Sequence, residues 1–159
     1  GLFDKPEEFT TLASFYLYKK NPAMSAKVLE NAISEDQILF DTKNAKLLSD
    51  SWLFAKERIK SLDVIEESLS LNPNEEKLVN QYVNIAFSAF EWKEVINGIR
   101  KAEQIGIEDD GKHDLMIGIA FFETKDLKNA ENSFIKASNS KKYSDQGKAW
   151  LEYLNALKG

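Results

Sequence analysis

Small residues recur along the chain at fixed spacings, and the same arrangement appears four times. In the last copy Gly118, Ala130 and Ala137 lie 12 and 7 residues apart, among apolar residues at helical spacing. The same two spacings fall on Ala13, Ser25 and Ala32, on Ser49, Ser61 and Ser68, and on Val83, Val95 and Ala102. Ten of these twelve positions are Ala, Gly or Ser, which let two helix axes approach closely. The pattern therefore predicts four helical hairpins at steps of 36, 34 and 35 residues.

Larger apolar residues sit between the small ones at a constant register and are expected to fill the space between hairpins. They are Leu12, Leu48, Tyr82 and Ile117 in the first helices and Leu29, Ile65, Ile99 and Phe134 in the second. Capping signals agree with this division: Asp4, Asn21 and Asp126 each stand where a helix should begin, and Gly106 stands where one should end. The predicted helices are 5–20, 22–34, 42–57, 59–71, 74–90, 92–105, 112–124 and 127–138.

The run from Leu115 to Ala137, L-x-I-G-x-A-F-F and then D-L-x-x-A-x-x-x-F-x-x-A, resembles the tetratricopeptide repeat (TPR). The resemblance covers residues 6–138. It implies an all-α, right-handed superhelical solenoid forming one domain over residues 1–159. The four TPR-like hairpins span about 6–40, 42–74, 76–109 and 111–143, and residues 144–158 form a C-terminal capping helix.

Two stretches depart from the regular pattern. The third unit has Ala86 where the others have a large aromatic residue, so we expect its hairpin to splay slightly, with Phe87 or Trp92 compensating. The connection at 34–41 contains Ile38, Leu39 and Phe40, which are too apolar for a solvated loop and are expected to tuck under the second hairpin.

The two ends of the chain look different. Trp150, Leu151, Leu154 and Leu157 form one apolar stripe, as expected of a cap that covers the last hairpin, and we expect the natural C-terminus close by. At the other end, Leu2, Phe3 and Phe9 follow no polar capping helix. Either the first hairpin caps itself or the chain is a fragment of a longer array; we favour the fragment, and self-association through this edge is expected.

Composition narrows the classes of function. The net charge of −5 argues against sequence-independent nucleic-acid binding, which needs a basic face. No apolar run reaches the roughly 18 residues that a membrane span needs, so no direct membrane insertion is expected. The chain has no cysteine and a single histidine, His113, interpreted as a solvated residue. No nucleophile or phosphate-binding motif occurs, so we expect no enzymatic activity, no cofactor and no metal.

By resemblance, the first helix of each hairpin lines a concave groove. The predicted partner-binding residues are Leu17, Tyr18, Lys43, Lys46, Leu53, Phe54, Lys77, Asn80, Asn84, Phe87, Lys112, Met116, Ile119 and Phe122. Thr10, Ser14, Asp50, Gln81 and Leu115 lie among them. Two interpretations stay open: a groove with an apolar floor and a partly basic lip, or ordinary inter-repeat packing with solvated lysines. Glu131 and Asn132 are expected on the convex side.

The predicted function is a non-catalytic scaffold that binds a protein or peptide segment. The alternative is a structural or oligomerisation segment without a ligand of its own. The runs 12–16, 26–30, 47–53 and 149–153 are also similar to the C-terminal repeats of exported Gram-negative TPR proteins associated with TonB-type systems. That resemblance implies a bacterial, periplasmic protein in a transport complex; a cytoplasmic location is the alternative.

Overall fold

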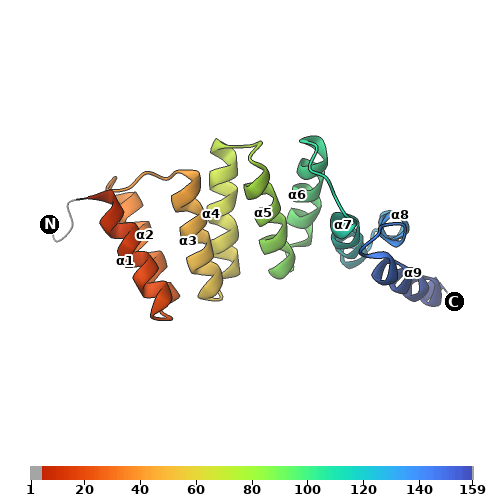
Figure 1. The fold of residues 1–159 in the computed structure, drawn as a ribbon. Helices are drawn as coiled ribbons and strands as arrows, with labels where there is room; N and C mark the ends of the chain where they lie inside the picture. Colours follow the sequence, from red (N-terminus) through yellow and green to blue (C-terminus); the bar gives the residue numbers. More distant parts are fainter. Residues whose placement is uncertain (1–4, 159) are drawn as a thin grey trace. The chain divides into compact units, whose positions relative to one another are not determined.

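In the computed structural model, residues 5–158 are described and every regular element among them is a helix (Figure 1). The helices are α1 (Pro6–Tyr18), α2 (Pro22–Ser34), α3 (Thr42–Phe54), α4 (Arg58–Leu71), α5 (Glu76–Ser88), α6 (Trp92–Gln104), α7 (Lys112–Glu123), α8 (Leu127–Ser138) and α9 (Ser144–Lys158). The chain forms two compact units, residues 1–85 and 86–159, with the boundary inside α5. We call them unit 1 and unit 2.

The predicted helices are confirmed, with ends that differ by at most three residues. Asn21 and Asp126 are N-caps as expected, since their side chains accept the backbone N–H groups of Met24 and Asn129 at 3.4 and 3.2 Å. The cap of α1 is different. Asp4 lies outside the described residues, and Lys5 is the N-cap, donating its backbone N–H to Glu8 Oε2 at 3.0 Å.

All twelve small positions of the repeat are buried. Among them Ser49 Oγ lies 2.9 Å from Ser61 Oγ, which joins α3 to α4. Ser25 Oγ lies 2.9 Å from Ser51 Oγ, which joins α2 to α3. Both pairs sit where two helices meet, and hydrogen bonding offsets the cost of burying their hydroxyl groups. Among the described residues no buried side-chain nitrogen or oxygen lacks a hydrogen-bond partner.

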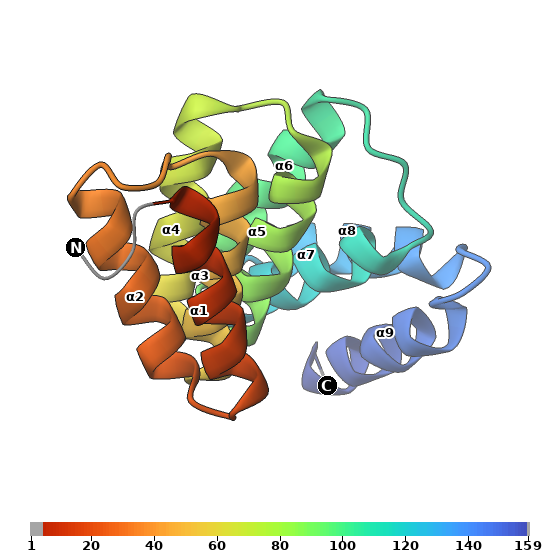
Figure 2. The ribbon, with the colours of Figure 1, turned by 60° about the vertical axis from the view of Figure 1, so that its left-hand side comes forward.

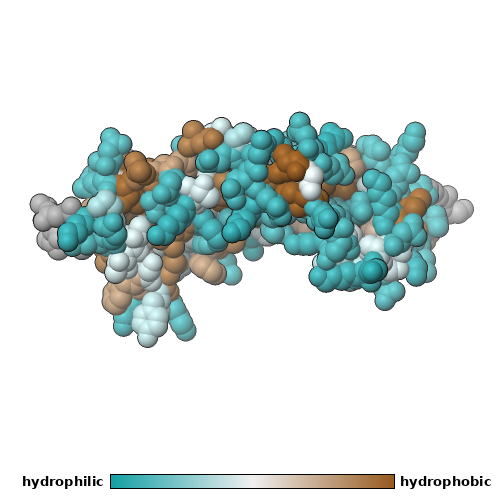
Figure 3. All heavy atoms as spheres, turned by 45° about the horizontal axis from the view of Figure 1, so that its top comes forward, coloured by the Kyte–Doolittle hydropathy of each residue, from teal (hydrophilic) through white to brown (hydrophobic). Residues whose placement is uncertain are grey.

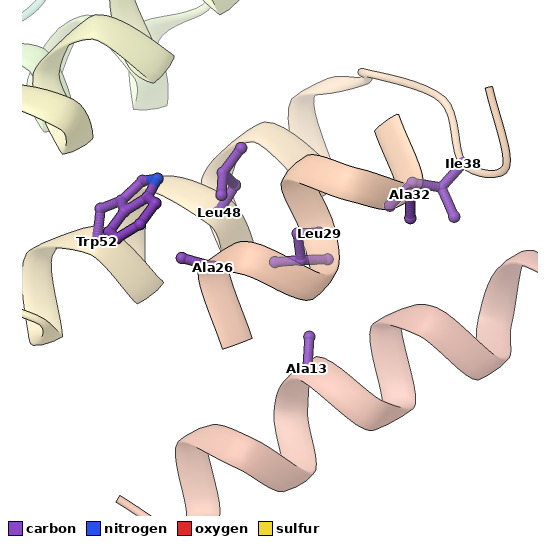
Figure 4. Close-up of a cluster of buried hydrophobic side chains, with 7 residues drawn as sticks. All are labelled: Ala13, Ala26, Leu29, Ala32, Ile38, Leu48 and Trp52. Atoms are coloured by element: carbon purple, nitrogen blue, oxygen red, sulfur yellow. The ribbon is translucent and has the colours of Figure 1, made fainter. Parts of the chain in front are cut away.

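The core of unit 1 gathers around the second helix of its first hairpin (Figure 4). Leu29 of α2 is fully buried between Ala13 of α1 and Leu48 of α3, as the register predicts. Trp52 closes one end of this cluster: its Nε1–H donates to Glu30 Oε1 at 2.9 Å, and Lys60 Nζ lies 4.2 Å from its ring centroid. These contacts connect three consecutive helices through one indole ring.

Ile38 closes the other end of the same cluster and is 5% exposed. Phe40 is half-buried, but Leu39 is 78% exposed. The expectation that all three residues of this connection tuck inward is therefore wrong for Leu39. Consecutive side chains of an extended segment point in opposite directions, so burying Ile38 turns Leu39 outward.

The four turns inside the hairpins share one geometry. Each places a non-glycine residue in the left-handed region: Lys20, Lys56, Phe90 and Lys125, with φ between 58° and 68°. In the second hairpin Lys56 N–H donates to Leu53 O at 3.0 Å and Glu57 N–H to Trp52 O at 2.9 Å, which is a Schellman motif. Equivalent bond pairs occur in the other three turns. The repeat is thus present in the geometry of the turns as well as in the helices.

Glycine occupies this conformation after α6. Gly106 has φ of 78°, and its N–H donates to Glu103 O while Ile107 N–H donates to Ala102 O. The prediction that Gly106 ends this helix is confirmed.

Unit 2 contains α6, the fourth hairpin and α9 (Figure 2). Near its start, Phe87 and Trp92 meet edge to face with centroids 5.7 Å apart, as expected where Ala86 leaves space in the third hairpin. At its other end α9 packs on α8: Leu154 is 1% exposed and Trp150 stacks on Phe134 at 5.1 Å and 10°. Leu157 is 55% exposed, so the predicted apolar stripe of α9 reaches the core only through Leu154 and its neighbours.

Gly147 sets the distance between α8 and α9. A Cβ there would overlap the backbone nitrogen of Ser138 and lie 2.8 Å from the carbonyl carbon of Ala137. Backbone atoms cannot move aside as a side chain can, so α9 approaches α8 this closely because residue 147 has no side chain.

The shared turn geometry generates a stability prediction. Lys56→Gly should stabilise the protein by about 0.5–1 kcal/mol, because a left-handed non-glycine residue is strained. Chemical denaturation followed by circular dichroism measures this change in the free energy of unfolding. The neighbouring Ala55→Gly is the control: Ala55 has φ of −73°, so the same substitution should destabilise the protein there. Equal effects of the two substitutions would contradict the argument.

The contact at Gly147 generates a second prediction. Gly147→Ala should separate α9 from α8 and destabilise unit 2 by about 1–3 kcal/mol, because the added methyl group overlaps backbone. The tryptophan emission, to which Trp150 contributes beside Trp52 and Trp92, should move to longer wavelength, and limited proteolysis should remove α9 first. Gln146→Ala, at the exposed preceding position, should leave both measurements unchanged.

Candidate functional site

The predicted partner-binding residues lie on the first helices of the hairpins, and we call the surface that carries them the groove face. In unit 1 it runs over α1, α3 and the part of α5 up to residue 85. In unit 2 it runs over α7, preceded by Phe87 at the end of α5. On the side of the molecule seen in Figure 3, hydrophilic side chains predominate and hydrophobic ones form small separate areas.

A hollow of about 450 Å³ lies on the groove face of unit 1, between α1 and α3. It is lined by Thr10, Thr11, Ser14, Lys43, Lys46, Leu47 and Asp50. A second hollow of about 390 Å³ shares Thr10 and Lys43 with it and extends toward the connection at 36–41. The structure therefore brings together five residues that the sequence analysis placed on this face, from two different hairpins. Their chemistry is polar, whereas the predicted floor was apolar.

Asp50 organises the charges of this hollow. Its Oδ2 accepts Lys46 Nζ at 2.7 Å, and its Oδ1 accepts Gln81 Nε2 at 3.0 Å. These two bonds fix the position of Lys46 and connect α3 to α5. Lys43 is exposed, and no ion pair involving it is found in the described part of the chain. Two lysines thus line the hollow, and one of them, Lys46, is held in place by Asp50.

Two exposed aromatic rings lie at the C-terminal ends of α1 and α3. Tyr18 of α1 is 80% exposed and Phe54 of α3 is 65% exposed, at equivalent positions of successive hairpins. Leu17 and Leu53 beside them are half-buried. Thr10 and Tyr18 are eight residues apart, which is about 12 Å along a helix, or the length of about four residues of extended chain. On α5, Lys77 and Asn84 are exposed and Asn80 is half-buried.

In unit 2 the predicted site residues are mostly engaged. Phe122 contacts Trp150 and Tyr153, with centroid distances of 5.3 and 5.7 Å. Met116 is 6% exposed and belongs to the core rather than to a partner surface, because its position faces inward once α7 packs. Ile119 and Lys112 are half-buried, and Phe87 is half-buried against Trp92.

Sequence reasoning missed an apolar hollow on α9. It measures about 320 Å³ and is lined by Ala149, Trp150 and Tyr153. The sequence does contain a signal for this hollow, because Ala149, Tyr153 and Leu157 recur every four residues along the helix. The sequence analysis considered one apolar face only, the one that runs through Trp150 and Leu154. Tyr153 and Leu157 are about half exposed, so α9 has a second apolar side.

Asp114 is the titratable group of the described chain that combines partial burial with a shifted pKa. Burial, together with the nearby charge of Asp109, raises the pKa of Asp114 above its ordinary value. Asp109 itself accepts the backbone N–H groups of His113 and Asp114 at 2.9 and 3.1 Å, so this cluster caps α7. His113 is half-buried rather than fully solvated. Over residues 5–158 no three His, Asp or Glu side chains are grouped as metal ligands.

The repeated helical hairpins define the class of fold, an all-α, TPR-like solenoid. The solved structure of the MamA RS-1 ArsTM double mutant is similar to this chain with a TM-score of 0.75 at 14% identity, covering 99% of this chain and 87% of that one. The structure of MamA 41-end from Desulfovibrio magneticus RS-1 has a TM-score of 0.74 at 13% identity, covering 99% of this chain and 88% of that one. A further crystal structure of MamA has a TM-score of 0.62 at 18% identity, covering 83% of this chain and 75% of that one.

At these identities the likeness concerns the fold, and it confirms the predicted all-α, TPR-like solenoid. No protein-family model and no curated protein matches the sequence. Within the described residues, no helix is both long and apolar enough to cross a membrane.

The packing of Phe122 generates a third prediction. Phe122→Ala should destabilise unit 2 by about 1–3 kcal/mol, because it removes two aromatic contacts to α9. A thermal melt followed by circular dichroism and by Trp150 fluorescence measures the loss. Ile135→Ala, at a 45% exposed apolar position on α8, should cost much less. An unchanged melt for Phe122→Ala would mean that α9 does not depend on this ring.

Proposed function

We propose that this chain is a non-catalytic protein-interaction scaffold that holds a partner segment on the groove face of unit 1. The observation that carries the proposal is the polar hollow between α1 and α3, together with two exposed rings, Tyr18 and Phe54, farther along the same two helices. Rigid helices present this surface without further ordering, so little conformational entropy is lost on binding.

The chemistry of the surface indicates the partner. Lys43 and Lys46 favour carboxylate groups, and the hydroxyl groups of the α1 side offer hydrogen bonds. Tyr18 and Phe54 favour an apolar or aromatic side chain about four residues away along an extended segment. The proposed partner is therefore an extended protein segment with acidic residues followed or preceded by an apolar anchor.

The exposed rings should supply most of the affinity and the lysines most of the steering. Desolvated aromatic anchors dominate interfaces, whereas an exposed ion pair contributes about 1 kcal/mol or less. Lys46 is already paired with Asp50, so a partner carboxylate competes with an existing bond. Doubling the salt concentration should accordingly weaken binding only modestly while slowing association.

The location and the wider assembly are proposals that rest on the sequence resemblance alone. A place in the periplasm of a Gram-negative bacterium, in a transport complex associated with a TonB-type system, is consistent with a scaffold. Fractionation of the native cells with an antibody against this chain tests it: recovery from the cytoplasm would overturn the periplasmic assignment.

The fourth prediction tests the scaffold. Tyr18→Ala combined with Phe54→Ala should reduce the affinity for the partner at least about tenfold and leave the melting temperature nearly unchanged, because both rings are solvent-exposed. The partner is identified by comparing pull-downs with the original chain and with this variant, and its affinity is then measured with purified proteins.

The matched control is Ile59→Ala. Ile59 is 48% exposed and apolar, but it lies on α4, the second helix of its hairpin. Introducing a charge at Asn132 of α8 is a further control away from the groove face. If these controls weaken binding as much as the double variant does, the groove face of unit 1 is not the binding surface.

A further inference from the structure

In the first helix of a hairpin, a line of side chains along one side, which we call the stripe, packs against the preceding hairpin. The same stripe is present in α1, but no helix of the described chain packs against it there. In α3 the stripe runs through Leu48 and Ser51, and Ser51 is hydrogen-bonded to Ser25 of α2. In α9 it runs through Gly147 and Leu154, which pack on α8. The repeat register puts Glu8, Leu12, Phe15 and Lys19 at these positions in α1.

Burial separates α1 from the later first helices. The position occupied by Phe15 in α1 holds Ser51, Ile85, Ala120 and Leu154 in α3, α5, α7 and α9, and all four are at most 2% exposed. Phe15 is 50% exposed, and Leu12 is half-buried. Among these five equivalent positions, the one that is open to solvent therefore carries the largest side chain, Phe15.

The stripe is self-complementary. Consider two copies of α1 that run antiparallel around a two-fold axis midway between Leu12 and Phe15. A residue of one copy then lies opposite the residue of the second copy whose number adds with its own to 27. Leu12 then meets Phe15 of the second copy, and Glu8 meets Lys19 of the second copy. The two-fold axis repeats both contacts, so the apolar pair at the centre is flanked by an ion pair on each side.

We propose that α1 is a homodimer interface, in which two copies of this chain pair antiparallel through Glu8, Leu12, Phe15 and Lys19. The charges decide the orientation, because a parallel arrangement would place Glu8 against Glu8 and Lys19 against Lys19. They also favour a second copy as the occupant, because the antiparallel pairing of two identical stripes places each Glu8 against a Lys19. A single helix pair buries less than about 1,200 Å², which is the range of weak complexes, so the dimer should be a weak one.

The interface is separate from the groove face. Tyr18 lies on α1 but not on this stripe, and Phe54 lies on α3. Lys19 of the stripe places its Nζ 5.8 Å from the centroid of the Tyr18 ring, so the two proposals are tested separately through Phe15 and Phe54, which lie on different helices. The failure of one proposal leaves the other standing.

Sedimentation equilibrium of the 159-residue chain from about 0.01 to 1 mM tests the proposal, since this range brackets the affinity expected of a small interface. A monomer–dimer equilibrium is expected. Phe15→Ala should raise the dissociation constant at least about tenfold. Phe54→Ala, which removes a more exposed ring outside the stripe, should leave it unchanged. A chain that stays monomeric throughout this range overturns the proposal and assigns the face to a helix outside this chain.

The charge pair supplies the more specific test. Lys19→Glu should weaken the dimer, because Glu8 then faces a second carboxylate in both symmetry-related pairs, and Glu8→Lys should weaken it for the corresponding reason. The double variant Glu8→Lys with Lys19→Glu should dimerise more tightly than either single variant, because each charge meets its opposite again. Glu8 also accepts the backbone N–H of Lys5 and so caps α1, and circular dichroism of each variant checks that the helix is retained. A double variant weaker than both single ones overturns the antiparallel arrangement.

Discussion

The close approach of neighbouring helices at small side chains is the constraint on which the rest of this structure depends. Where Ser49 faces Ser61, and Ser25 faces Ser51, two hydroxyl groups satisfy each other in a fully buried contact. Larger residues would push the axes apart and leave the intervening side chains, such as Leu29 and Ile65, without close packing. The small residues thus fix the helix spacing, and the spacing determines which larger residues form the core.

The turns reinforce this constraint at a cost. Each hairpin closes with a Schellman motif whose left-handed residue is Lys or Phe rather than Gly. The hydrogen bonds of the motif satisfy carbonyl groups at the end of the first helix and direct the second helix back along it. Because the same strained conformation occurs in all four turns, hairpin packing must supply more free energy than the strain takes away. Phe90 adds a direct contribution through its contact with Trp92.

The fold could be predicted from the sequence because its signals are local and repeated. The twelve small positions, the caps at Asn21 and Asp126, and the end of α6 at Gly106 each depend on a few neighbouring residues and agree with one another. The site could be predicted only in part. Periodicity places Lys43, Lys46 and Asp50 on one face, but it does not reveal that Asp50 holds Lys46, or that Phe122 is covered by α9. Those facts depend on side-chain contacts that periodicity does not specify, and on how a capping helix lies over its neighbour.

The two units use the same helix geometry for different surface chemistry. On α3 the groove positions Lys46 and Asp50 form an ion pair beside an open hollow. The equivalent positions on α7, at Leu115 and Ile119, are apolar and half-buried. A repeat protein can vary these positions freely, because the small residues that set the helix spacing lie on another side of the same helix. In this chain, that separation leaves unit 1 with a polar surface between α1 and α3. In unit 2 the groove position of Phe122 is used to hold α9, and the apolar surface that remains exposed lies on α9 itself, around Tyr153.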